Sequence, residues 1–195
     1  MFTGIIQGTA KLNKIISKNN NYTYVLESNL KLNKKDIGTS IAIEGVCLTL
    51  IKFQKTLANK KLFFNISPET LKISSLQDKS LGEFLNLEKS LKFGDEIAGH
   101  FLQGHVDDTG TVLSVKKNKN SWIFWIKIKA KFKKYLINKG SIAINGVSLT
   151  INEIKSNNIR VDIIPHTFQR TNFKYLKKNM KVNIEFDLLI KFLKK

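Results

Sequence analysis

Two pairs of small polar residues, Cys47 with Thr49 and Ser148 with Thr150, carry the side chains best suited to chemistry in this chain. Because side chains alternate between the two faces of a strand, residues two apart project from the same face. A thiol or hydroxyl beside a second polar group can act as a nucleophile or assist proton transfer. A lone cysteine is more often a small buried apolar residue, and only the pairing with Thr49 favours a chemical role for Cys47.

The histidines offer acid–base chemistry but no metal site. His100 and His105 lie five residues apart in a strand-like run, so in a regular strand they would point to opposite faces and could not share a metal. A structural role for each is the simpler alternative. Asp187, taken by itself, reads as the N-cap of the apolar tail that follows it. The sequence contains no P-loop, complete dinucleotide-binding glycine motif or nucleophile elbow.

The polar pairs belong to a sequence that occurs twice. The eleven residues 40–50 recur as 141–151 with eight identities, and the only two prolines, Pro68 and Pro165, stand at matching places. Residues 85–88 also return as 182–185, and residues 4–9 return more loosely as 104–109. A long repeat present only twice indicates duplicated domains rather than a solenoid.

Period-two alternation of apolar residues predicts strands in both copies, as at Tyr22, Tyr24 and Leu26. Within the repeated segment the alternation slips by one residue at 44–45 and again at 145–146, which predicts a glycine-containing bulge or tight turn. After the slip in the first copy, residues 46, 48 and 50 face the core, while Cys47 and Thr49 share the other face. Short helical turns are expected at 30–38 and 132–136.

These elements predict an all-β protein in which each half closes into a small antiparallel barrel, because closure removes exposed strand edges. We place the N-terminal domain at residues 1–95, the C-terminal domain at 96–186 and a short helix at 187–195, with the boundary between domains near 89–98.

Composition excludes several classes of protein. The chain has 195 residues, 42% of them hydrophobic, which is enough to fold without disulfides, and its single cysteine excludes an internal disulfide. No run of about 18 apolar residues or signal-peptide pattern occurs, so we expect a cytoplasmic protein and no membrane partner. The net charge of +18 suggests nucleic-acid binding. However, all basic residues except Arg160 and Arg170 are lysines spread along the chain, which favours solvated faces instead.

The opening residues 1–8, the repeated Gly-Val-Cys/Ser-Leu-Thr, the segment 99–106 and the Pro-Glu/His-Thr pair resemble riboflavin synthase of the alpha-chain type over nearly the whole chain. The resemblance implies two tandem, similar six-stranded antiparallel Greek-key β-barrels with a short C-terminal helix. It also implies a homotrimer, with association with lumazine synthase as a further partner. The implied reaction converts two molecules of 6,7-dimethyl-8-ribityllumazine into riboflavin and 5-amino-6-ribitylaminouracil, without a metal or organic cofactor.

The resemblance also implies two sets of substrate contacts, which meet across neighbouring subunits. In the first barrel they are Gly4, Ile5, Ile6, Cys47, Leu48, Thr49, Asn65, Ile66, Ser67, Pro68, Glu69 and Thr70. In the second barrel they are Gly104, His105, Val106, Lys139, Ser148, Leu149, Thr150, Ile164, Pro165, His166, Thr167, Phe168 and Gln169.

Holding two like molecules together is expected to be the main source of catalysis, because it replaces a rare bimolecular encounter. We hypothesise that His105, with Ser148 and Thr150, assists deprotonation of the donor methyl group. Cys47, or a water that it holds, would add to the acceptor ring. Supporting positions are expected at Phe2, Ser40, His100 and Asp187.

Two departures from the family pattern stand out. His166 occupies the place of a glutamate, so binding there is expected to depend on pH. The tail from Asp187 is too short to form a stable isolated helix, and a readily dissociating trimer is expected. The alternatives are a non-catalytic relative that holds one lumazine or flavin as a chromophore, and a tandem-barrel nucleic-acid-binding protein.

Overall fold

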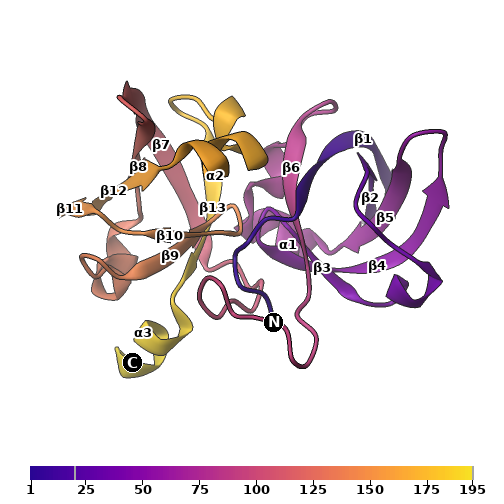
Figure 1. The fold of residues 1–195 in the computed structure, drawn as a ribbon, viewed down its shortest axis with the longest axis horizontal. Coiled ribbons are helices and arrows are strands. Elements are labelled where there is room, and N and C mark those ends of the chain that lie inside the picture. Colours follow the sequence, from indigo (N-terminus) through magenta and orange to yellow (C-terminus); the bar gives the residue numbers. More distant parts are fainter. Residues whose placement is uncertain (20, 195) are drawn as a thin grey trace.

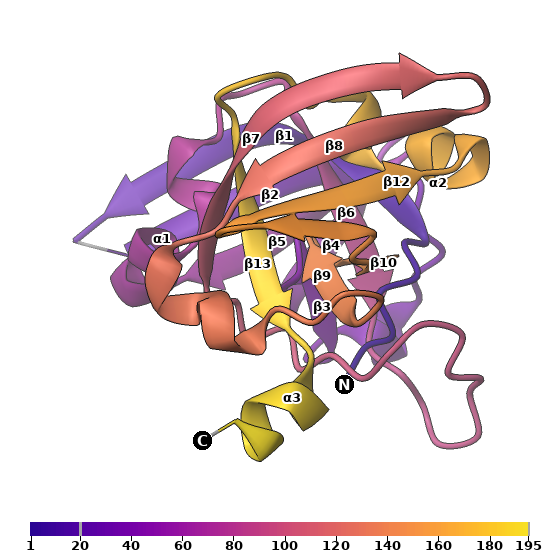
Figure 2. The same ribbon diagram turned by 90° about the vertical axis from the view of Figure 1, so that its left-hand side faces the viewer.

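Alternation of apolar and polar residues produces strands throughout both halves of the computed structural model, which describes residues 1–19 and 21–194. The two halves form separate β domains that lie side by side (Figure 1). Loops at the lower edge join them, and the C-terminal helix lies on the same side (Figure 2).

The first domain is a closed antiparallel barrel with the strand order β1-β2-β5-β4-β3-β6. Its strands are β1 (Gly8–Lys18), β2 (Asn21–Ser28), β3 (Ser40–Ile43), β4 (Val46–Lys55), β5 (Lys60–Ile66) and β6 (Phe84–Lys89). Its helical turns are η1 (Lys34–Asp36), α1 (Pro68–Ile73) and η2 (Ser75–Asp78).

The second domain repeats this arrangement in a seven-stranded sheet with the order β10-β9-β13-β7-β8-β12-β11. Its strands are β7 (Asp108–Asn118), β8 (Ser121–Lys127), β9 (Ser141–Ile144), β10 (Val147–Thr150), β11 (Glu153–Lys155), β12 (Asn158–Ile163) and β13 (Lys181–Phe186). Its helical elements are η3 (Ala130–Tyr135), α2 (Pro165–Arg170), η4 (Asn172–Tyr175) and α3 (Leu188–Leu193).

The second domain has one strand more than expected because the counterpart of β4 is interrupted. In β4 the pairing with β5 shifts between Leu50 and Lys52, whereas at the equivalent place residues 151–152 belong to no strand and separate β10 from β11. There the amide of Ile151 donates to the carbonyl of Gly140 at 2.9 Å, and the amide of Asn152 donates to the carbonyl of Arg160 at 2.8 Å. The tandem of two similar β domains is therefore confirmed, with this local difference.

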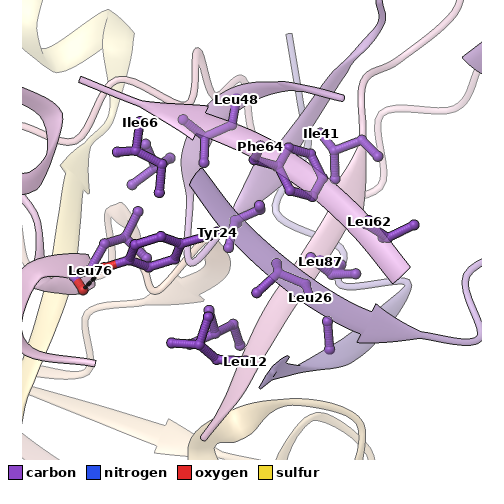
Figure 3. Packing of buried hydrophobic residues seen from close by; sticks show 14 of the residues in the cluster. Leu12, Tyr24, Leu26, Ile41, Leu48, Leu62, Phe64, Ile66, Leu76 and Leu87 are labelled. Carbon is purple, nitrogen blue, oxygen red and sulfur yellow. Dashed lines mark hydrogen bonds between the residues drawn. The ribbon is translucent and has the colours of Figure 1, made fainter. Parts of the chain in front are cut away.

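Each domain has its own apolar core. In the first, Leu12, Leu26 and Phe64 are fully buried, and the hydroxyl of Tyr24 donates to the carbonyl of Leu76 at 2.8 Å (Figure 3). In the second, Phe124 meets Phe173 edge to face, with 5.1 Å between ring centroids. The period-two alternation therefore marks core positions correctly in both copies.

A polar network joins the two domains. The side-chain amide of Asn86 donates to the carbonyl of Asn145 at 3.0 Å, and that of Asn183 donates to the carbonyl of Glu44 at 2.8 Å. Glu44 is fully buried and lies 3.5 Å from the Nζ atom of Lys79. Burial raises the pKa of Glu44, and the charge of Lys79 opposes that shift. The network fixes the two repeats against each other.

α3 is short, as expected, and Asp187 caps its first turn by accepting a hydrogen bond from the amide of Leu189 at 2.9 Å. The Nζ atom of Lys191 lies 3.1 Å from a carboxylate oxygen of Asp107, which ties the helix to the second domain. Lys195, the last residue of the predicted helix, lies outside the described residues. Among the described residues, the helices are all too short or too polar to cross a lipid bilayer.

Candidate active site

Two matching hairpin turns present the polar pairs. Glu44–Gly45 and Asn145–Gly146 join β3 to β4 and β9 to β10, and all four residues have positive φ, as in the two-residue turns that suit twisted hairpins. The expected tight turn is thus confirmed. Beyond it, Val46, Leu48 and Leu50 are buried, whereas Cys47 is half-buried and Thr49 exposed. In the second domain Ser148 is half-buried and Thr150 exposed.

The segments that precede the first strand of each domain run antiparallel and meet between the domains. The amide of Phe2 donates to the carbonyl of Leu102 at 2.8 Å, and the amide of Leu102 donates back at 3.0 Å. Beyond this bridge each segment reaches the other domain. The carbonyl of Gly4 accepts from the amide of Ser148 at 2.9 Å, and that of Gly104 accepts from the amide of Cys47 at 2.8 Å.

This close approach requires glycine at both positions. A Cβ atom on Gly104 would lie 2.6 Å from the Cβ atom of Cys47, and one on Gly4 would lie 2.6 Å from that of Ser148. Both glycines also have positive φ, at 76° and 79°. The backbone of each segment therefore forms one wall beside the polar pair of the other domain.

The contacts of these segments differ from the expected grouping of the site residues. The resemblance places residues 4–6 with the first barrel, whereas Gly4 contacts Ser148 and Ile6 packs against the second core. Conversely, Gly104 contacts Cys47, and Val106 belongs to the first core. Neither hydrogen bond joins residues near each other in sequence, so the alternation of residues within each repeat could not reveal the exchange.

A cavity of about 180 Å³ lies beside Cys47 in the first domain. It is lined by Val46, Cys47, Thr70, Ile73, Ser74, Gly104, His105 and Val106. α1 supplies Thr70 and Ile73, and Ser74 follows directly after the helix. The first turn of α1 is fixed by Pro68 and by Ser67, whose hydroxyl accepts from the amide of Thr70 at 3.1 Å. This cavity thus combines a thiol, an imidazole and a hydroxyl on rigid supports.

At the matching place in the second domain, His100 stands beside Ser148. The imidazole Nδ1 atom lies 2.7 Å from the hydroxyl of Ser148. The sequence hypothesis pairs His105 with Ser148 in sites that meet across neighbouring subunits; within the chain, His105 lines the cavity beside Cys47. His100, expected only as a supporting residue, takes the place beside the serine.

Burial lowers the pKa of His100, and the nearby charge of Asp187 opposes the shift. A lowered pKa keeps the imidazole neutral at neutral pH. With Nδ1 as the acceptor, the hydroxyl of Ser148 donates to it, and the ring can take up a proton. The other ring nitrogen, Nε2, is buried without a hydrogen-bond partner in the described part of the chain.

Two buried carboxylates that sequence reasoning missed hold the crossing segments. Glu88 accepts hydrogen bonds from the amides of Thr3 and Gly4 at 2.7 and 3.0 Å. Glu185 accepts from the amides of Gln103 and Gly104 at 2.8 and 3.0 Å. Burial raises the pKa of Glu185 to about 7 and also raises that of Glu88. Their signal in the sequence is the repeated Asn-x-Glu of residues 86–88 and 183–185, which also aligns the two copies.

Lys139 combines an exposed side chain with a left-handed backbone. Its φ is 65°, and its amide donates to the carbonyl of Ile151 at 2.8 Å, as the amide of Gly38 does to Leu50 in the first domain. Left-handed φ is unfavourable for a residue with a Cβ atom. A lysine where the other copy has glycine therefore points to a use for the side chain.

The remaining predicted site residues lie around these groups without joining one cluster. Leu48, Ile66 and Phe2 are buried, Leu149 packs against the second core, and Ser40 pairs in register with Thr49. Asn65 accepts a hydrogen bond from the hydroxyl of Thr23 at 2.9 Å. Exposed positions on or beside α1 and α2 are held by Ser67, Pro68, Glu69, Ile164, Pro165, His166 and Gln169, whereas Thr167 is half-buried. Phe168 stacks on Trp122.

No group of three or more His, Cys, Asp or Glu side chains within residues 1–19 and 21–194 is arranged to hold a metal ion.

The family model described as the lumazine binding domain matches this chain twice, at residues 3–90 and 103–187. The two β domains are therefore a tandem of lumazine-binding domains. The chain is 37% identical over 196 residues to the riboflavin synthase of Photobacterium leiognathi, covering 100% of this chain and 88% of the relative. It is 38% identical over 189 residues to that of Escherichia coli, covering 96% and 87%. The chain belongs to the riboflavin synthase family.

Solved structures share the fold. LumP complexed with riboflavin superposes with a TM-score of 0.83 at 24% identity, covering 95% of this chain and 99% of that one. LumP complexed with 6,7-dimethyl-8-(1'-D-ribityl) lumazine gives a TM-score of 0.80 at 23% identity over the same shares.

Proposed function

We propose that this chain is a riboflavin synthase that converts two molecules of 6,7-dimethyl-8-ribityllumazine into riboflavin and 5-amino-6-ribitylaminouracil. The observation that carries the proposal is the pair of related sites, one beside Cys47 and one beside Ser148, each walled by a glycine segment from the other repeat. The full-length similarity to riboflavin synthases supports it.

The reaction moves a four-carbon unit from one lumazine to the other, which makes the enzyme a transferase. Because the two substrates together contain every atom of the two products, we propose no cofactor. Each site has only to hold a flat ring, assist proton transfer and stabilise the anion formed from an acidic ring methyl group.

We assign different tasks to the two sites. In the second domain, His100 accepts the proton that Ser148 passes from the donor methyl group, and Thr150 and Lys139 face the anion that forms. In the first domain, the thiol of Cys47 or a water that it holds adds to the acceptor ring, with His105 as the proton donor. The hydrogen bond between His100 and Ser148 supports the first assignment, and the cavity beside Cys47 and His105 supports the second.

The two sites of one chain are separated by the bridged segments around Phe2 and Leu102. Face-to-face contact of two lumazines therefore requires the first domain of one chain to meet the second domain of another, and we propose a homotrimer. Exposed apolar side chains lie in the crossing segments, the linker and α3, and these are Ile5, Ile97, Phe101, Leu189 and Leu193. Their burial between chains would remove apolar surface from water.

We further propose that residues 1–95, 96–186 and 187–195 are the functional units, and that the enzyme works in the cytoplasm. Association with lumazine synthase, the expected source of the substrate, is part of the same proposal.

The test is to incubate the purified protein with 6,7-dimethyl-8-ribityllumazine and no added cofactor, and to follow the absorption of riboflavin. We expect riboflavin and one equivalent of the pyrimidine product for every two lumazines consumed. The Ser148→Ala and Cys47→Ser variants should each lose at least about tenfold in rate, as expected when a proton-transfer or nucleophilic group is removed. Tight lumazine binding without turnover would instead indicate a chromophore-binding relative.

A further inference from the structure

A stacked aromatic pair fills a groove in the second domain that its counterpart in the first domain leaves open. Trp122 at the start of β8 and Phe168 in α2 lie parallel, with 3.8 Å between ring centroids and 3° between planes. Both side chains pack against the second core. The pair covers the space between the β7–β8 hairpin and α2.

The repeat alignment places Tyr22 at the position of Trp122 and Leu71 at the position of Phe168. A leucine is smaller than a phenylalanine and lacks a ring, and the space opens as a groove of about 370 Å³. Its lining is Ile15, Tyr22, Tyr24, Pro68, Leu71 and Gln77. This volume lies within the range of small-molecule sites, about 300–1,000 Å³.

We propose that this groove binds a planar heteroaromatic ring, stacked on Tyr22 as Phe168 stacks on Trp122. The second domain itself demonstrates which shape fits between these elements, because the same hairpin and helix there enclose a flat ring.

The chemistry of the lining defines the ligand class. Ile15, Leu71 and Pro68 supply apolar walls, and Tyr24 forms the floor with its hydroxyl already bonded to the carbonyl of Leu76, as Figure 3 shows. The exposed amide of Gln77 is the polar group on the rim, and it makes no hydrogen bond to any described residue. A neutral ring with a hydrogen-bonding edge satisfies both features, whereas a charged ligand would find no partner of opposite sign in this lining.

The groove is separate from the cavity beside Cys47. Thr70 and Ile73 of α1 line that cavity, while Pro68 and Leu71 of the same helix line the groove. The two sites therefore contact different faces of one short helix. The inference does not rest on the proposed function, because the groove lies away from Cys47 and shares only Pro68 with the expected substrate contacts of the first domain.

The test measures binding of indole, a neutral bicyclic ring with one N–H, by saturation-transfer NMR. The wild-type protein should bind it, and Leu71→Phe should weaken binding at least about tenfold by filling the groove as Phe168 does. Phe168→Leu should open the equivalent groove and add a second site. Unchanged affinity in Leu71→Phe, or no binding by the wild type at millimolar indole, would overturn the proposal.

Tyr22→Ala provides an independent variant, because Tyr22 is only partly buried and lies at the edge of the first core rather than among its fully buried residues. It should also weaken indole binding about tenfold through loss of the stacking face. An indole affinity equal to that of the wild type in Tyr22→Ala would likewise contradict the stacked pose, whether or not Leu71→Phe folds.

Discussion

Glycines at two positions let one domain complete the site of the other. At Gly104 two requirements coincide, a φ of 76° and a space in which an added Cβ atom would lie 2.6 Å from that of Cys47. At Gly94 the φ of 89° is also left-handed, but nothing lies within 4 Å of the added atom. Substitutions at Gly94 and Gly104 therefore distinguish the cost of a left-handed backbone from the cost of a steric clash.

We predict that Gly104→Ala lowers the free energy of unfolding by more than about 3 kcal/mol, since strain and overpacking act together. Gly94→Ala introduces only the strain of a left-handed φ and should lower the free energy of unfolding by about 1–2 kcal/mol. Urea unfolding of both variants measures the difference. Equal losses would mean that the contact with Cys47 relaxes at little cost.

The raised pKa of Glu185 predicts how the stability of the protein depends on pH. Its pKa is raised from 4.5 to about 7, so the folded state holds a proton that the unfolded chain loses, and stability falls as pH rises between about 4.5 and 7. The shift corresponds to about 3 kcal/mol at most. In Glu185→Gln this contribution is absent, and the melting temperature should change less across that window than in the wild type.

The control for this prediction is Glu83→Gln, which changes a half-buried carboxylate outside the crossing segments. It should keep the wild-type slope of melting temperature against pH. A Glu185→Gln variant with that same slope would show that other buried carboxylates, such as Glu88 and Glu44, account for the dependence.

At the scale of elements, the loop before β9 carries a strained residue that its counterpart avoids. Lys139 has a φ of 65° where the first domain has Gly38, and we expect the strain to be retained for binding. Lys139→Gly should raise the free energy of unfolding by about 0.5–1 kcal/mol and reduce the rate of riboflavin formation.

Ser156→Gly is the matched control for Lys139, since Ser156 has a φ of 57° in the turn between β11 and β12. It should stabilise the protein similarly and leave turnover unchanged. If Lys139→Gly also keeps full turnover, its side chain has no part in the reaction.

The strands and their core faces could be predicted because they follow from local alternation, as at Tyr24 and Leu26, and because the second copy repeats the pattern. The phase slip at Glu44–Gly45 likewise predicted the hairpin turn. The partners of the site residues could not be predicted, because hydrogen bonds such as that from Cys47 to Gly104 depend on how the domains pack. For the same reason, alternation could not predict that His105 lines the cavity beside Cys47 within the chain.

The interruption between β10 and β11 was also beyond prediction. The amide of Ile151 donates to the carbonyl of Gly140 as that of Leu50 does to Thr39, and Asn152 still donates to Arg160 of β12, so the hydrogen bonds of the two copies stay alike on both sides of the break. The register shift at residues 50–52 and the interruption at residues 151–152 therefore lie at the same position of the repeat.

For the whole molecule, we expect α3 and its neighbours to contribute to the proposed trimer. α3 has six residues and exposes Leu189 and Leu193 to 62% and 77%. Such a short helix is unstable without packing partners, and we expect contacts in the proposed trimer to add to the ion pair of Lys191 with Asp107. The proposed trimer should therefore dissociate as the protein is diluted.

We predict that Leu189→Asp with Leu193→Asp shifts sedimentation toward the monomer at concentrations where the wild type is assembled, and that activity falls in parallel. Leu57→Asp, at a fully exposed site in the β4–β5 loop, should change neither. Full activity in a monomeric double variant would contradict sites shared between chains.

The exchange of segments around Phe2 and Leu102 also bears on chimeric enzymes. A breakpoint in the linker looks neutral, because it leaves every strand of each barrel with its own relatives. Yet such a hybrid would face Ser148 with a Gly4–Ile6 segment from one parent and Cys47 with a Gly104–Val106 segment from the other. Both candidate sites would then contain residues of both parents. To keep each site within one parent, the breakpoints should follow residue 6 and residue 106, so that each segment comes from the parent of the domain that it contacts.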